Sequence, residues 1–245
     1  MKNLEKGTPK LMLAWAFYDW ANSVYTLVIA STIFPIYYGA LFRQKGIEEI
    51  QLAGFTIQSD ALIPYVTAIG FLIIAFISPL LSGIADYLGN KKFFLKFFCY
   101  LGSISCMSLY FFSLENIVVS LLFYLLALIG FWGSLVFYNS YLPDIAPKEQ
   151  QDRISAKGFS LGYIGSVILL LICLAMVLLV DESNAIQMMR YSFVLVGIWW
   201  IGFSQYTYYY LPNNRNDKKL HVDIIFNGFK AVSYTHLRAH ETVLD

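Results

Sequence analysis

The stretch Leu11–Phe42 constrains this chain most, because it is apolar over a length that crosses a bilayer and yet carries a carboxylate. A transmembrane helix needs about 20 mainly apolar residues. At about 1.5 Å rise per residue, Asp19 lies roughly 12 Å along such a helix, towards the middle of a hydrocarbon layer about 30 Å thick. A carboxylate at that depth is costly unless it faces protein or a watery cavity, so it marks a candidate working site.

Asp19 belongs to a polar stripe on this otherwise apolar helix. Helical spacing places Asn22 and Thr26 on the same side as Asp19, and Tyr18 is its direct neighbour. We therefore predict a substrate or coupling cavity along this stripe. Asn139, near the end of a later apolar run, is a candidate for the opposite wall. The alternatives are that Asp19 only pairs with a neighbouring helix and that Asn139 only satisfies a neighbour's backbone.

The composition is that of an integral membrane protein. Hydrophobic residues make up 58% of the chain and charged residues 13%, against roughly 45–50% and 25% in soluble domains. The apolar runs predict six transmembrane helices, since a barrel would show short alternating segments. The runs are Leu11–Phe42, Ala61–Leu81, Phe93–Phe112, Ile117–Leu142, Phe159–Val180 and Tyr191–Leu211. The predicted fold class is therefore an all-α membrane protein.

The distribution of basic residues predicts the orientation. Six spans place both ends of the chain on one side of the membrane, and cytoplasmic loops carry an excess of Lys and Arg. Twelve basic residues fall on the side of the chain ends: Lys2, Lys6, Lys10, Lys91, Lys92, Lys96, Lys148, Arg153, Lys157, Arg215, Lys218 and Lys219. Three fall on the other side: Arg43, Lys45 and Arg190. We expect both ends to be cytoplasmic.

The segment between the second and third runs, Ser82–Lys92, resembles the cytoplasmic signature loop of the major facilitator superfamily. The matching positions are Ser82, Gly83, Asp86, Gly89, Lys91 and Lys92, with Ser82 in place of the usual first glycine. Gly89 would permit a tight reversal, and Asp86 could meet a helix N-terminus of another bundle. The basic pair would stay with the cytoplasmic headgroups. The alternative is an ordinary charged turn.

Two further stretches resemble one branch of that superfamily. Trp15–Ser23 (WAFYDWANS) and Tyr138–Ala146 (YNSYLPDIA) are similar to the vacuole-effluxer-like branch, which includes fungal vacuolar amino-acid exporters and bacterial members. The resemblance covers Leu11–Leu211 and implies a major facilitator fold and solute export. It also implies that the six helices form an N-terminal bundle of 3+3 inverted repeats, although the two halves show no residue-level repetition.

The loop after the fourth run offers a candidate charge pair, Asp144 with Arg153, with a solvated loop as the alternative. The fourth run lacks the membrane-embedded arginine that many proton-coupled members of the superfamily carry. This departure argues against proton coupling by that route.

The C-terminal part is expected to lie outside the membrane bundle, which we assign to residues 1–211. Residues 212–230 resemble the start of the linker between the two halves of a major facilitator, and 231–245 resemble the translation of a sequencing adapter. We exclude the latter from fold reasoning, including its His236 and His240. The expected missing partner is a C-terminal six-helix half.

The predicted function is secondary active transport of a small solute, with amino acids as one candidate and a proton or cation as coupling ion. A proton-coupled sugar or drug transporter and a non-transporting membrane scaffold are the alternatives. An intramembrane enzyme is disfavoured, because no histidine lies in the spans. No metal, cofactor or nucleic acid is expected, and the expected location is a bacterial cytoplasmic membrane, in contact with lipid.

Overall fold

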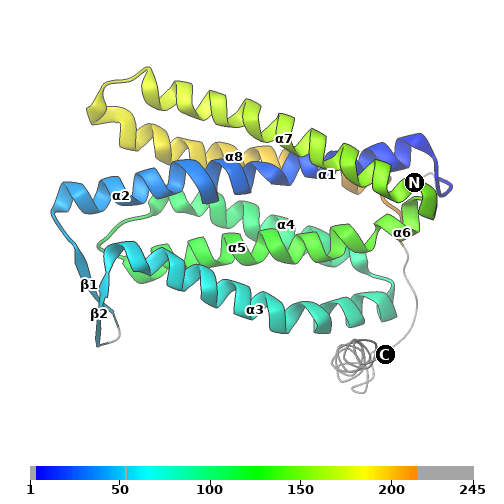
Figure 1. Cartoon of the computed structure of the whole chain (residues 1–245), viewed down its shortest axis with the longest axis horizontal. Coiled ribbons are helices and arrows are strands. Elements are labelled where there is room, and N and C mark those ends of the chain that lie inside the picture. The colour runs from blue at the N-terminus through cyan, green and yellow to red at the C-terminus, as the bar shows by residue number, and fades with distance from the viewer. Residues whose placement is uncertain (1–3, 53, 214–245) are drawn as a thin grey trace, which may run out of the picture.

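The computed structural model describes residues 4–52 and 54–213, except for the side chains at 84 and 86–88. Within these residues six helices are long and apolar enough to cross a membrane. They run antiparallel to their sequence neighbours, and the first and last helices have their terminal ends at the same end of the bundle (Figure 1). The predicted all-α membrane fold with six spans is confirmed. The expected linker and adapter segments lie outside the described residues, apart from 212 and 213.

The first span is one continuous helical path in three parts. It comprises α1 (Pro9–Val24), a π-helical segment (Tyr25–Ile33) and α2 (Phe34–Lys45). Pro9 is at the helix start, where its missing N–H costs nothing. Gly46 ends the span with a φ of 61°, and the Ile47 N–H bonds to the Phe42 carbonyl (3.2 Å). The π-helical segment was not predicted, and such segments are frequent at functional sites.

A short β-hairpin follows the first span and was missed from the sequence. β1 (Glu49–Leu52) pairs antiparallel with β2 (Phe55–Gln58), with Ile50 opposite Ile57. Gly54, with a φ of 85°, occupies the turn. The hairpin lies beyond the end of the bundle opposite the chain ends (Figure 1).

The middle spans are α3 (Ser59–Leu88), α4 (Lys91–Ser108) with a 3₁₀ turn (Leu109–Phe111), and α5 (Ile117–Ser140) with the short α6 (Leu142–Ile145). The turn between α3 and α4 holds only Gly89 and Asn90. The predicted signature loop is thus wrong in extent, because Ser82 and Gly83 still belong to α3.

The last two spans begin well before their apolar runs. α7 spans Lys148–Leu178 and α8 spans Glu182–Tyr210. The polar first turns of α7 contain good helix formers, so the helix projects beyond its apolar part. Hydropathy therefore located both spans but missed where they start.

The core lies between α1, α4, α5, α7 and α8. α1 packs against both α7 and α8, α4 packs against α5 and α8, and α3 packs mainly on α5. Gly102 of α4 and Gly130 of α5 allow their backbones to approach closely, since a Cβ at Gly130 would lie 2.3 Å from the Gly102 backbone. Trp200 of α8 fills the space beside Gly102 and is fully buried. α1 has few contacts with α5, so a space remains between the first span and α5, beside α7.

Candidate functional site

A cavity of about 470 Å³ opens where the first span faces α5 and α7. The first span contributes Trp15, Asp19, Asn22, Ser23, Thr26, Leu27 and Ser31; α5 contributes Phe131, Trp132, Leu135, Tyr138 and Asn139; α7 contributes Ser155, Phe159, Tyr163 and Ser166. The cavity therefore follows the first span along much of its length. Four of the five predicted cavity residues line it: Asp19, Asn22, Thr26 and Asn139.

Asp19 is the charged group of the cavity wall. The residue is 8% exposed, and its Oδ2 accepts a hydrogen bond from the Tyr138 hydroxyl (2.9 Å). Among the described residues, no Lys or Arg lies within ion-pair distance of it. A buried carboxylate with a single neutral hydrogen bond retains most of its capacity to accept further bonds. Asp19 is thus available to a cationic or hydrogen-bonding ligand.

Tyr138 is held in place by Trp15. The two rings stack with centroids 4.3 Å apart and an interplanar angle of 11°, and the Trp15 Nε1–H donates to the Tyr138 carbonyl (2.8 Å). The orientation of the Tyr138 hydroxyl towards Asp19 therefore depends on contacts between α1 and α5. The sequence does not single out Trp15 or Tyr138 as a site residue, although both belong to the stretches that resemble the vacuole-effluxer-like branch. Their positions could have indicated a role, because Trp15 lies four residues before Asp19 on the same helix and Tyr138 directly precedes Asn139.

Three glycines of α7 bring that helix against α1. A Cβ at Gly158 would lie 2.5 Å from Asp19 Oδ2 and 3.1 Å from the Tyr138 hydroxyl. A Cβ at Gly162 would lie 2.5 Å from Ser23 Oγ, and one at Gly165 would lie 2.9 Å from the Trp20 carbonyl. Small residues spaced in this way let helix backbones approach closely. Gly158 also leaves the space that the Asp19 carboxylate occupies.

The neutral polar groups of the wall differ in how they are bonded. Thr26 Oγ1 donates to the Ser23 carbonyl (2.8 Å). Asn22 is 1% exposed, and its Nδ2 has no hydrogen-bond partner within the described structure. A buried amide donor without a partner costs free energy, about 1–3 kcal/mol. Asn139 is exposed at the cavity edge.

Tyr18 lies apart from the other predicted cavity residues. It is fully buried, with its ring 5.1 Å from that of Tyr138 and 6.4 Å from that of Tyr208. Its side chain packs within the bundle, because consecutive residues of a helix point in different directions. The structure thus places Tyr18 behind the cavity wall.

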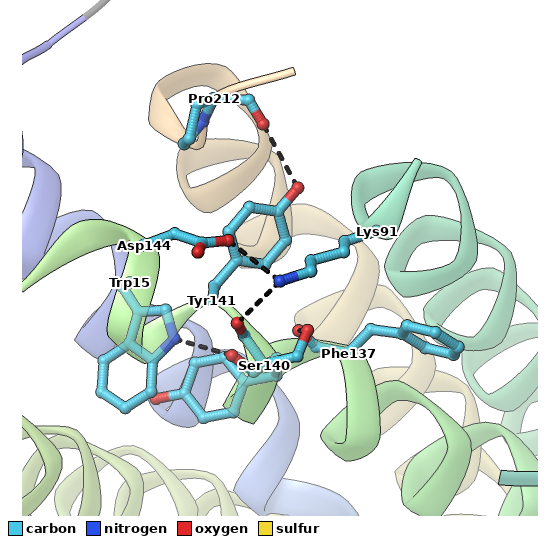
Figure 2. A network of polar contacts seen from close by, with 8 residues as sticks. Trp15, Lys91, Phe137, Ser140, Tyr141, Asp144 and Pro212 are labelled. Carbon is cyan, nitrogen blue, oxygen red and sulfur yellow. Dashed lines mark hydrogen bonds and ion pairs between the residues drawn. The ribbon is translucent and has the colours of Figure 1, made fainter. Parts of the chain in front are cut away.

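The turn between α3 and α4 lies at the end of the bundle that holds the chain ends (Figure 1). Lys91 and Lys92, which follow this turn, form a junction with other helix ends, and Figure 2 shows the contacts of Lys91. Gly89 adopts a φ of 62°, and the Asn90 N–H bonds to the Ala85 carbonyl (3.0 Å), which closes α3 with a Schellman turn. The expected reversal at Gly89 agrees with this geometry. The side chain of Asp86 lies outside the described part of the structure.

The two lysines of the junction bond to protein groups, in contrast to the expected contact with headgroups. The Lys91 ammonium donates to Asp144 Oδ2 (3.0 Å) and to the Ser140 carbonyl (3.2 Å), linking α4 to the end of α5 and to α6 (Figure 2). The buried Lys92 ammonium donates to the Leu211 carbonyl at the end of α8 (2.8 Å). Cations are favourable at helix C-termini, so Lys92 stabilises the end of α8.

The predicted pair of Asp144 with Arg153 is wrong, because Asp144 forms its ion pair with Lys91. Arg153 is exposed in the first turns of α7. Lys91 follows the short turn after α3 directly, which brings its side chain to Asp144 although 53 positions separate them in the sequence. Among the described residues, no group of three or more His, Cys, Asp and Glu side chains could hold a metal ion.

Comparison with known proteins identifies the class to which this fold and cavity belong. The model of the family described as vacuole effluxer Atg22 like matches residues 7–243. The chain belongs to this family, and the resemblance predicted from its WAFYDWANS and YNSYLPDIA stretches is confirmed. It is an integral membrane protein of a transporter family.

Individual relatives agree with this assignment. The chain is 36% identical over 235 residues to the uncharacterized MFS-type transporter YxiO of Bacillus subtilis, a match covering 93% of the chain and 52% of that protein. It is 23% identical over 282 residues to autophagy-related protein 22 of Chaetomium globosum, covering 80% and 43%. It is 21% identical over 234 residues to autophagy-related protein 22-2 of Aspergillus fumigatus, covering 67% and 38%. The chain spans about half the length, or less, of these curated relatives.

Proposed function

We propose that this chain forms the N-terminal half of a secondary transporter that moves a small solute by alternating access, with amino acids as the first substrate class. The observation that carries the proposal is the cavity around Asp19, formed by three spans. Transporter sites lie near the bilayer midplane between two bundles, where an intramembrane carboxylate has a functional use. The described bundle supplies one wall of such a site.

The exposed apolar faces beside the cavity suit a partner bundle. α3 and α7 flank the cavity side of the molecule and expose large hydrophobic side chains. Those of α3 include Tyr65, Ile69, Leu72 and Phe76, and those of α7 include Phe159, Tyr163, Ile164 and Leu171. A second six-helix half would cover part of these faces, with lipid covering the rest. Rocking of the two halves would then open the cavity to each side in turn.

The distribution of basic residues supports a cytoplasmic location for the junction end of the bundle. The start of α4, which begins at Lys91, and the start of α7 lie at the same end of the bundle as the start of α1 (Figure 1). Under the positive-inside rule this end faces the cytoplasm of a bacterial cell. Asp19 would bind the solute or carry a coupling proton in the same cavity.

The experiment that tests the proposal is transport by the full-length protein in proteoliposomes, with Asp19→Asn as the variant. Removing the charge should lower coupled transport by tenfold or more, about the effect of losing a charge-assisted hydrogen bond. Glu115→Gln is the matched control, because Glu115 is an exposed carboxylate whose side chain is 79% accessible. Unchanged transport by a correctly inserted Asp19→Asn protein would refute the proposal.

A further inference from the structure

We infer that this wall of the cavity selects a primary ammonium group with a neutral hydrogen-bond acceptor beside it, and that a ligand needs no free carboxylate to bind here. The inference rests on the proposed function, since it names the chemical class that the transport cavity would accept. It depends on three features of the wall: its charge, its aromatic surface and one amide without a partner.

The charge of the wall favours a cation. Asp19 is the one ionisable acid or base among the described cavity-lining residues other than the tyrosines, and no Lys or Arg lines the cavity with it. Its carboxylate receives one described hydrogen bond, from the Tyr138 hydroxyl. A carboxylate withdrawn from water is stabilised by a cationic partner and by further donors. An ammonium group supplies both, with three N–H donors and a positive charge.

The aromatic surface supports the same ligand. Trp15, Tyr138, Phe159 and Tyr163 line the cavity together with Asp19. Aromatic faces attract ammonium groups and also pack against apolar substituents, so this surface suits an amine that carries a hydrophobic side chain. An anionic ligand would meet the negative faces of these rings and the Asp19 carboxylate without a cation on this wall.

Asn22 indicates where the ligand's hydrogen-bond acceptor would lie, because its amide offers a donor. Its Nδ2 is buried and without a hydrogen-bond partner, and the residue lines the cavity three positions after Asp19 on the same helix. Residues three apart on a helix are neighbours on its surface. A ligand whose ammonium group binds Asp19 can therefore offer an oxygen to Asn22 from an adjacent carbon. An amide carbonyl serves this purpose as well as a carboxylate does.

The test compares four ligands that differ only in their polar groups: phenethylamine, phenylalaninamide, phenylalanine and 3-phenylpropionate. Binding to the purified full-length protein would be measured by calorimetry and by competition with labelled phenylalaninamide. We expect the three amines to bind and 3-phenylpropionate, which lacks the amine, to bind at least about tenfold more weakly. Equal binding of 3-phenylpropionate and phenethylamine would overturn the inference.

Two variants separate the two contacts. Asp19→Asn should weaken all three amines by about tenfold or more, whereas Asn22→Ala should weaken phenylalaninamide and leave phenethylamine unchanged. Glu115→Gln, at an exposed carboxylate outside the cavity, should retain amine binding. Size exclusion of Asp19→Asn guards against a folding defect in that variant. If the affinity for the amines were the same in Asp19→Asn as in the unsubstituted protein, the inference would be contradicted.

Parallel transport measurements distinguish this inference from the proposed function. Amines that bind through Asp19 without crossing the membrane would support the inference and refute transport. Asp19-dependent transport of a sugar or an acid, with no binding of the amines, would support transport and overturn the inference.

Discussion

At the residue scale, the position of Asp19 was predictable and its surroundings were not. A carboxylate inside an apolar run is conspicuous in any sequence, and helical spacing places Asn22 and Thr26 on its side of the helix, where all three residues line one cavity. The Tyr138 hydroxyl and the Gly158 gap could not be predicted, because they depend on how α5 and α7 pack against α1. The predicted partner of Asp144 was wrong for a similar reason, because its pairing with Lys91 depends on how α4 packs against the end of α5.

Gly158 gives a prediction about this packing. In Gly158→Ala the new methyl group would lie 2.5 Å from Asp19 Oδ2, so the carboxylate or α7 must move. Overpacking of this kind costs about 1–3 kcal/mol. We expect a lower melting temperature in detergent, measured by fluorescence-detected size exclusion, together with weaker ligand binding.

Gly202→Ala is the matched control for Gly158→Ala. A Cβ at Gly202, which is also within a helix, would meet no atom within 4 Å. Alanine should be neutral there or stabilise α8 by about 0.5–1 kcal/mol. Equal effects of the two substitutions would show that the space beside Asp19 does not constrain the packing of α7.

At the scale of elements, the six spans follow from hydropathy, while their ends and irregularities do not. Apolar length alone identifies a span. The early start of α7, the π-helical segment Tyr25–Ile33 and the β-hairpin depend on local hydrogen bonding that hydropathy does not report. The junction at Lys91 and Lys92 likewise links helix ends that are far apart in the sequence.

The junction predicts a measurable coupling between α4 and α6. Lys91→Met and Asp144→Asn should each destabilise the protein, and the double variant should lose less than the sum of the two. The pair is partly buried, with side chains 18% and 31% exposed, so we expect a coupling of about 1 kcal/mol in a double-mutant cycle.

The exposed pair of Lys45 with Glu115 is the control for this cycle. Its atoms are 3.3 Å apart, with side chains 48% and 79% exposed. Solvent screening should reduce its coupling below about 0.5 kcal/mol. If the two cycles gave equal values, the junction would contribute no more than an ordinary surface contact.

At the scale of the whole molecule, the described bundle has one well-packed core and one wall of a cavity. The packing of α1 against α7 and α8 leaves its polar stripe facing the cavity. Hydropathy was sufficient to predict the six spans, and the resemblance of two short stretches was sufficient to predict the family. The solute stays a prediction, because the neutral and charged groups of the described cavity wall suit more than one class of small molecule.

The most direct test of the central claim, that the cavity is a water-filled transport site, is labelling of Ser31→Cys in the full-length protein. Ser31 is exposed within the cavity lining, and the native Cys99, Cys106 and Cys173 are buried. A small water-soluble thiol reagent should modify Ser31→Cys, and bound ligand should slow the reaction. Ser134→Cys, fully buried between helices, should stay unmodified. An unreactive Ser31→Cys would instead indicate that this face is closed by helix contacts, as in a membrane scaffold.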